Sequence, residues 1–184
     1  MVATQDVVLV SSADEKRRRS ITSALRARWP VRTASDSRAI DASLDASIAV
    51  VVIDSDTLDR AATALQAGDA ERTFYQVLCL GHSNHSLREQ ADAVLDSDVS
   101  REPLQTAVER LQARARYDRL LTTFYELASV EDGLDGASKR ASAREEELVA
   151  VKRELDEVAA QLDDADAFDV ALTAHGDDDH SSST

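Results

Sequence analysis

A chain of 184 residues has room for one domain of ordinary size and an extension, and its 43% of apolar residues support a core of modest size. Aromatic residues make up only 4%, so this core has to be aliphatic, and a single cysteine, Cys79, excludes an internal disulfide and a cysteine-rich metal site. No segment approaches the roughly 18 apolar residues of a membrane span, and the first residues lack the pattern of a signal peptide, so we expect a cytoplasmic protein.

The net charge of -14 comes from 35 acidic and 21 basic residues, and the only lysines are Lys16, Lys139 and Lys152. Because acidic, lysine-poor surfaces keep proteins soluble at high salt, we interpret the chain as that of a halophilic archaeon; an acidic bacterial protein is the alternative. Residues 1–116 carry 15 basic and 17 acidic residues, whereas residues 117–184 carry 6 and 18. This asymmetry predicts two regions with different functions and makes DNA an improbable ligand of the second.

Short apolar runs alternate with helical segments in the first half. The runs predict strands at residues 6–10, 31–34, 48–53, 75–80 and 93–95. Helices are predicted between them at 12–28, 36–44, 58–67 and 86–92, with a further helix from near Ser100; Ser12 and Glu15 fit a capping box. This alternation predicts an α/β fold, a doubly wound five-stranded parallel sheet of the flavodoxin-like order 2-1-3-4-5.

The second half has no strand pattern. Its apolar residues keep helical spacing up to a break at 132–136, and then Leu148, Val151, Leu155, Val158 and Leu162 repeat at 4-3 spacing. Such a stripe has to be buried, either in an α-helical hairpin or in a coiled coil that forms a homodimer through residues 104–164. We expect an α/β domain at 5–115, a helical domain at 116–172 and a disordered polar tail at 173–184.

Polar residues follow the predicted strands where the strands end. Asp54 ends the apolar run 48–53, Ser11 and Ser12 follow the first strand, Gly81 follows the fourth and Ser97 the fifth. Open α/β sheets bind ligands at the carboxyl ends of their strands, so these residues are candidates for a site. Taken alone, Asp54 is better interpreted as a loop carboxylate or a helix cap than as a site.

Residues 7–10 (VVLV), 50–54 (VVVID) and 94–101 (VLDSDVSR) resemble the receiver domain of two-component response regulators. The resemblance covers residues 5 to about 115 and implies that Asp54 stands at the phospho-accepting position. It also implies departures: Ser11 and Ser12 replace the acidic pair that holds magnesium, Gly81 replaces a hydroxyl residue, and Ser97 replaces a lysine.

These departures predict a degenerate receiver, or pseudo-receiver. Phosphoryl transfer depends on positioning and charge neutralisation, and magnesium is usually held by carboxylates, so Asp54 alone would be a weak magnesium ligand at most. We therefore expect poor phosphorylation, no enzymatic activity and no cofactor, with magnesium needed only if the receiver is still active. The basic run 16–19 (KRRR) is interpreted as a solvated face or a contact for an acidic protein.

Residues 117–121 (YDRLL), 124–129 (FYELAS) and 145–148 (EEEL) resemble the HalX domain, a helical module that follows receivers in haloarchaeal response regulators. Together the two resemblances imply a phosphorelay signalling protein whose partners are a histidine kinase or other signalling proteins. Two alternatives stay open: a functional response regulator phosphorylated on Asp54, and a transcriptional regulator that binds DNA through its helical half. A flavodoxin-like enzyme fits least, because the 5 glycines form no phosphate-binding loop.

Overall fold

The structure is a computed structural model that describes residues 7–57, 65, 74–81, 91–129 and 137–173, with side chains of the last segment described for 142–162. The chain divides into two compact units, Met1–Arg116 and Tyr117–Thr184, and each is described by itself. The predicted helices at 58–67 and 86–92 lie almost entirely outside the described residues. Leu65 is the exception: it is helical and buried.

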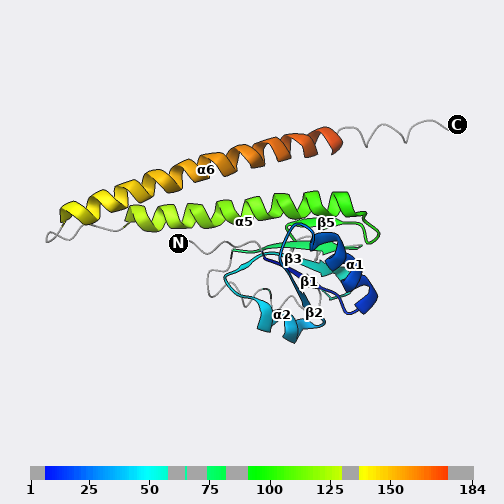
Figure 1. Cartoon of the computed structure of the whole chain (residues 1–184). Coiled ribbons are helices and arrows are strands. Elements are labelled where there is room, and N and C mark those ends of the chain that lie inside the picture. Colours follow the sequence, from blue (N-terminus) through cyan, green and yellow to red (C-terminus); the bar gives the residue numbers. More distant parts are fainter. Residues whose placement is uncertain (1–6, 58–64, 66–73, 82–90, 130–136, 174–184) are drawn as a thin grey trace. The chain divides into compact units, whose positions relative to one another are not determined.

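The first unit contains a five-stranded parallel sheet (Figure 1). Its strands are β1 (Val7–Ser11), β2 (Val31–Ala34), β3 (Ile48–Asp54), β4 (Gln76–Leu80) and β5 (Ala93–Leu95), in the order β2-β1-β3-β4-β5. The predicted flavodoxin-like order is therefore confirmed. The chain crosses from β1 to β2 on one side and returns to β3 on the other, so β1 and β3 flank the switch point of the sheet.

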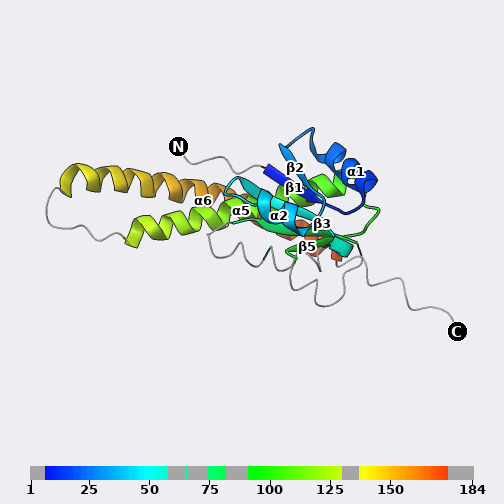
Figure 2. The same cartoon turned by 90° about the horizontal axis from the view of Figure 1, so that it is seen from below.

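The sheet is covered on both faces, which explains its continuous apolar strands. All residues of β3 are buried, and alternate side chains of the central strands enter two separate clusters. On one face Val52 packs with Ile21 and Leu25 of α1 (Glu15–Leu25) and with Leu104 of α5 (Arg101–Ser129). On the other face Ile53 and Leu9 pack with Ile40 of α2 (Ser37–Ser43). Figure 2 shows the same sheet from below, with α2 in front of it.

The amino end of α1 differs from the predicted capping box. Asp14 is the capping residue, and its carboxylate accepts hydrogen bonds from the backbone N–H groups of Lys16 at 2.7 Å and Arg17 at 3.1 Å. These bonds lower the pKa of Asp14 below its usual value. The helix begins at Glu15, because Ser12 is buried at the end of β1 and its hydroxyl is used elsewhere. The capping-box prediction was therefore wrong by two residues.

The second unit is helical, as predicted. It contains the last part of α5 and α6 (Ala137–Thr173), and the predicted break at 132–136 lies outside the described residues. Val151, Leu155 and Val158 of the 4-3 stripe are buried, and Leu148 and Leu162 are half-buried. No helix in the described parts of the chain is both long enough and apolar enough to cross a membrane.

Candidate functional site

The strand register brings three of the predicted site positions to one edge of the sheet. Ser11 of β1 pairs with Ile53 of β3, so Ser12 comes next to Asp54. Asp54 in turn pairs with Leu80 of β4, so Gly81 follows directly on its other side. Ser12, Asp54 and Gly81 therefore meet at the carboxyl ends of β1, β3 and β4, next to the switch point where this type of sheet binds ligands.

Asp54 is a nearly buried carboxylate with two partners, and its side chain is 12% exposed. The Ser12 hydroxyl lies 2.9 Å from Asp54 Oδ2 and donates a hydrogen bond to it. Arg17 Nε lies 2.7 Å from the same oxygen, although the angle is not that of a hydrogen bond. A buried carboxylate is costly unless it is paired, and here the guanidinium of Arg17 supplies the opposite charge.

Arg17 was missed by the sequence analysis, which interpreted the basic run 16–19 as a solvated face or an acidic-partner contact. The helical spacing contains the signal that would have found it. Arg17, Ile21 and Leu25 are spaced by four, so they lie in one row along α1, and Ile21 and Leu25 are buried in the core. A residue one turn before two core residues, in the first turn after β1, has to face the sheet edge where Asp54 stands.

The neighbouring basic residues are not part of this pair. Arg18 Nη1 donates to the backbone carbonyl of Ser12 at 2.6 Å, which ties the start of α1 to the end of β1. Arg19 pairs with Glu15 at 2.5 Å on the surface, where both side chains are mostly exposed. Of the three arginines in the run, Arg17 pairs with Asp54, whereas Arg18 and Arg19 bind other partners.

Gly81, Ser97 and Ser11 of the predicted site have no charged side chain to offer. Gly81 is buried and has a φ of 121°, a conformation that side chains rarely adopt, and its N–H donates to the carbonyl of Leu95 at 2.8 Å. Ser97 follows β5 and is exposed. Ser11 is fully buried, and its hydroxyl has no hydrogen-bond partner among the described residues.

The donor set at this edge does not fit magnesium. Magnesium in proteins is bound by carboxylates together with water and phosphate oxygens. At the carboxyl ends of β1 and β3, the described residues offer the carboxylate of Asp54, already paired with Arg17, and the hydroxyls of Ser11 and Ser12. The described residues contain no group of three or more histidine, cysteine, aspartate or glutamate side chains placed to hold a metal ion.

No family model matches the sequence, and no curated protein matches it significantly. Solved structures do match the fold. The signal receiver domain of an HD domain-containing protein from Pseudomonas fluorescens has a TM-score of 0.54 at 14% identity, covering 65% of this chain and 95% of that one. The chemotaxis protein CheY4 of Vibrio cholerae has a TM-score of 0.51 at 19% identity, covering 59% and 99%.

A third similar structure, described as an adenylate cyclase from Rhodopirellula baltica, has a TM-score of 0.55 at 14% identity and covers 68% of this chain and 99% of that one. At such identities the likeness extends to the fold and not to the activity. The match extends over nearly the whole length of each receiver domain, and the strand order agrees with the expectation from the sequence. The chain therefore has the fold of the receiver domains of response regulators, followed by a helical region.

Proposed function

We propose that this chain is a two-component signalling protein whose receiver domain is degenerate and acts through protein–protein contacts. One observation carries the proposal: Arg17 Nε lies 2.7 Å from Asp54 Oδ2, at the edge where an active receiver would need an acidic pair with magnesium. A guanidinium on α1 provides a fixed positive charge, so the carboxylate is stabilised without a metal. The partners would be a histidine kinase or other signalling proteins in the cytoplasm.

The chemistry of phosphoryl transfer supports this proposal. Catalysis of that reaction depends on neutralising charge on the transferred group and on holding attacking and leaving oxygens in line. Both Ser12 and Arg17 engage the same oxygen of Asp54, Oδ2. Ser11 and Ser12 stand at the positions where the receiver family has the acidic pair that holds a cation. Attack by Oδ2 on a phosphoryl donor would have to break these contacts, and attack by either oxygen would lack a metal to organise the donor.

The test is phosphorylation of the full-length chain by acetyl phosphate in the presence of magnesium, followed by intact mass measurement. We expect no stoichiometric gain of a phosphoryl group, while an active receiver in the same mixture is labelled. Asp54→Asn serves as the control for modification elsewhere. Stoichiometric labelling of the native chain that disappears in Asp54→Asn would overturn the proposal and establish the alternative, a functional response regulator.

The helical region would be a HalX-like module of a haloarchaeal regulator, and its 4-3 stripe would mediate contacts between signalling proteins. The buried residues Val151, Leu155 and Val158 support a packed helical role for it. DNA binding by this region is disfavoured, because residues 117–184 carry 6 basic and 18 acidic residues. A gel shift at several salt concentrations tests that alternative, and salt-dependent retardation would favour it.

A further inference from the structure

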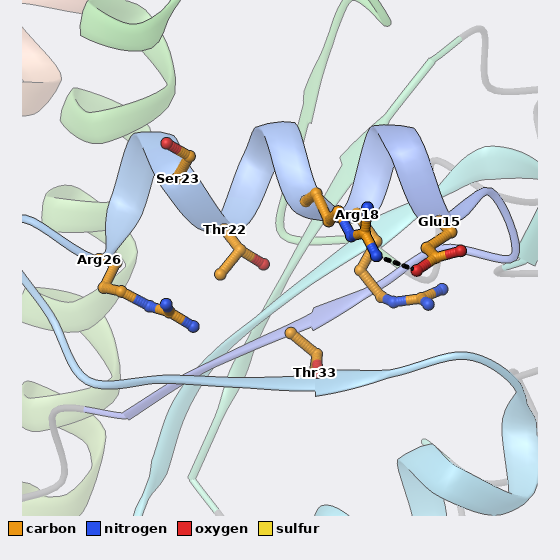
Figure 3. Close-up of a pocket in the computed structure, with 7 residues that line it drawn as sticks. Glu15, Arg18, Thr22, Ser23, Arg26 and Thr33 are labelled. Atoms are coloured by element: carbon orange, nitrogen blue, oxygen red, sulfur yellow. Dashed lines mark hydrogen bonds and ion pairs between the residues drawn. The ribbon is translucent and has the colours of Figure 1, made fainter.

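A second polar site lies away from Asp54, between α1 and β2. A cavity of about 420 Å³, here called the α1–β2 pocket, is lined by Arg18, Arg19, Arg26, Glu15, Thr22 and Thr33, among others (Figure 3). Three guanidinium groups against one carboxylate give it a formal charge of +2 at neutral pH, in a chain whose net charge is -14. The pocket is thus an electropositive hollow on a strongly acidic protein.

The helix geometry explains how the pocket forms. Arg18, Thr22 and Arg26 are spaced by four residues, so they form one row along α1 and its carboxyl-terminal capping residue Arg26, next to the buried row of Arg17, Ile21 and Leu25. Figure 3 shows the side chains of Arg18, Thr22 and Arg26 on the same side of α1, directed toward β2. The two arginines therefore flank the threonine hydroxyl on one face.

The Thr22 hydroxyl provides independent support for a ligand. Thr22 is 7% exposed, and its Oγ1 has no hydrogen-bond partner among the described residues. Threonines inside helices commonly donate to the carbonyl four residues earlier, and Thr106, Thr122 and Thr123 of this chain do so at 3.2, 3.1 and 3.0 Å. Thr22 does not make that bond, and a buried hydroxyl without a partner is energetically unfavourable. The Thr22 hydroxyl can therefore donate a hydrogen bond to an acceptor from outside the chain.

The arginines differ in how far they are already engaged. Arg19 pairs with Glu15, and Arg18 uses one of its donors on the carbonyl of Ser12. Arg26 is exposed, and its guanidinium makes no hydrogen bond or ion pair with another described residue; only its backbone N–H is bonded, to the carbonyl of Thr22 at 2.9 Å. A guanidinium has five N–H donors in a planar fork that matches the oxygens of phosphate, so Arg26 and the remaining donors of Arg18 suit such a group.

We propose that the α1–β2 pocket binds the dianionic phosphate group of a small molecule. Arg18 and Arg26 would contact its oxygens from either side, and Thr22 would donate its hydroxyl to a third. The +2 charge of the pocket matches a phosphate monoester at neutral pH, and the volume exceeds that of the phosphate alone. Either free phosphate or a phosphorylated metabolite supplies this chemistry. The inference concerns residues other than Asp54 and does not depend on whether Asp54 is phosphorylated.

The test is a titration of the full-length, nitrogen-15-labelled protein with inorganic phosphate at low ionic strength, followed by amide chemical shifts. We expect saturable shifts at Thr22, Arg26 and Thr33, absent when sodium chloride replaces phosphate at equal ionic strength. Parallel titrations with adenosine monophosphate and adenosine separate the sources. Tighter binding of the monophosphate than of phosphate assigns a phosphorylated metabolite, and equal binding assigns free phosphate.

Three variants connect the binding to the pocket. Arg26→Gln should weaken binding by about tenfold, the typical effect of losing one charge-assisted contact, and Thr22→Val by several-fold. Because the Thr22 hydroxyl makes no hydrogen bond with another described residue, the isosteric Thr22→Val should fold as well as the native chain, which separates loss of binding from loss of structure. Arg28→Gln is the matched control, since Arg28 lies just beyond α1 and pairs with Glu109 at 3.2 Å.

Three results would overturn the proposal. One is the absence of saturable shifts in the pocket residues with either phosphate or the monophosphate. Another is an equal loss of binding in Arg28→Gln and Arg26→Gln, which would indicate unspecific attraction to a basic helix. The third is binding of an acidic peptide at the same residues while phosphate and adenosine monophosphate leave them unshifted, which would identify a protein-docking surface instead.

Discussion

Replacing Arg17 by glutamine should destabilise the receiver unit far more than replacing Arg19, which stands two residues later on the same helix. Both arginines pair with a carboxylate, but the side chains of Arg17 and Asp54 are 28% and 12% exposed, whereas those of Arg19 and Glu15 are 77% and 63% exposed. Breaking a buried ion pair by removing one partner costs about 3–5 kcal/mol, and an exposed pair contributes about 0–1 kcal/mol.

For the Arg17–Asp54 pair, the free-energy cost of removing one partner should lie between these two values. Because Arg17 keeps some contact with solvent, we expect Arg17→Gln to lower the free energy of unfolding by about 2 kcal/mol, less than for a fully buried pair. Arg19→Gln should cost less than about 0.5 kcal/mol. Asp54→Asn should be milder than Arg17→Gln, since asparagine still accepts the hydrogen bond from Ser12 and Arg17 can turn to solvent.

The assay is urea denaturation of the full-length variants followed by circular dichroism, including the double variant Arg17→Gln/Asp54→Asn. The pair should show a coupling energy of about 1 kcal/mol or more, well above the 0.3–0.5 kcal/mol scatter of independent sites. The reasoning fails if Arg17→Gln costs no more than Arg19→Gln, or if the two single changes add within that scatter. Either result would mean that Asp54 does not depend on Arg17 for its charge compensation.

Gly81→Ala should destabilise the fold by about 1–3 kcal/mol in the same assay, because φ is 121° there and an added Cβ would lie 3.2 Å from Ser55 Cβ; a neutral result would contradict the assigned conformation. Hydrogen bonds from Ser47 and Arg32 lower the pKa of Asp45 to about 2, so the stabilisation of the fold by ionised Asp45 is present above about pH 4 and lost as the pH falls toward 2. Asp45→Asn should therefore flatten the plot of unfolding free energy against pH between these values, and an unchanged plot would count against the pairing. Magnesium chloride should leave the melting temperature equal to that in sodium chloride of the same ionic strength, because the edge lacks a suitable donor set; a concentration-dependent rise specific to magnesium would show a site for it.

The fold was predictable because its signals are local and strong. A parallel strand covered on both faces has to be apolar at every position, and the run 48–53 contains no polar residue; β3 extends it by one residue to Asp54. The strand order then follows from the alternation of strands and helices, since the handedness of the crossovers leaves few topologies. The boundaries of α1 were less predictable, because Ser12 and Asp14 are both good capping residues and only the buried position of Ser12 decides between them.

The site was only half predictable, for a different reason. The position of Asp54 follows from the apolar run 48–53, because the residue that ends a buried parallel strand lies at the carboxyl edge of the sheet. The identity of its partner depends on which side of α1 each arginine of a basic run faces, and four consecutive basic residues look alike in composition. Burial of Ile21 and Leu25 selects Arg17 from the run, because Arg17 stands one turn before Ile21 in the same row of the helix. Extending their row by one turn would have predicted the pair.

The Arg17–Asp54 pair also bears on whether this domain can switch. A modification changes a conformational equilibrium only by interacting differently with the two states. If Asp54 is not efficiently phosphorylated, as proposed, no modification at this site can shift such an equilibrium. Gly81, moreover, has no side chain that could follow a phosphoryl group. Arg17 belongs to the chain, so its charge is present at every metal concentration and cannot dissociate as an ion does. A receiver without such a modification would stay in one conformation, and its binding surfaces would be available to partners at all times. Regulation would then have to act elsewhere, through a ligand of the α1–β2 pocket or through the amount of protein.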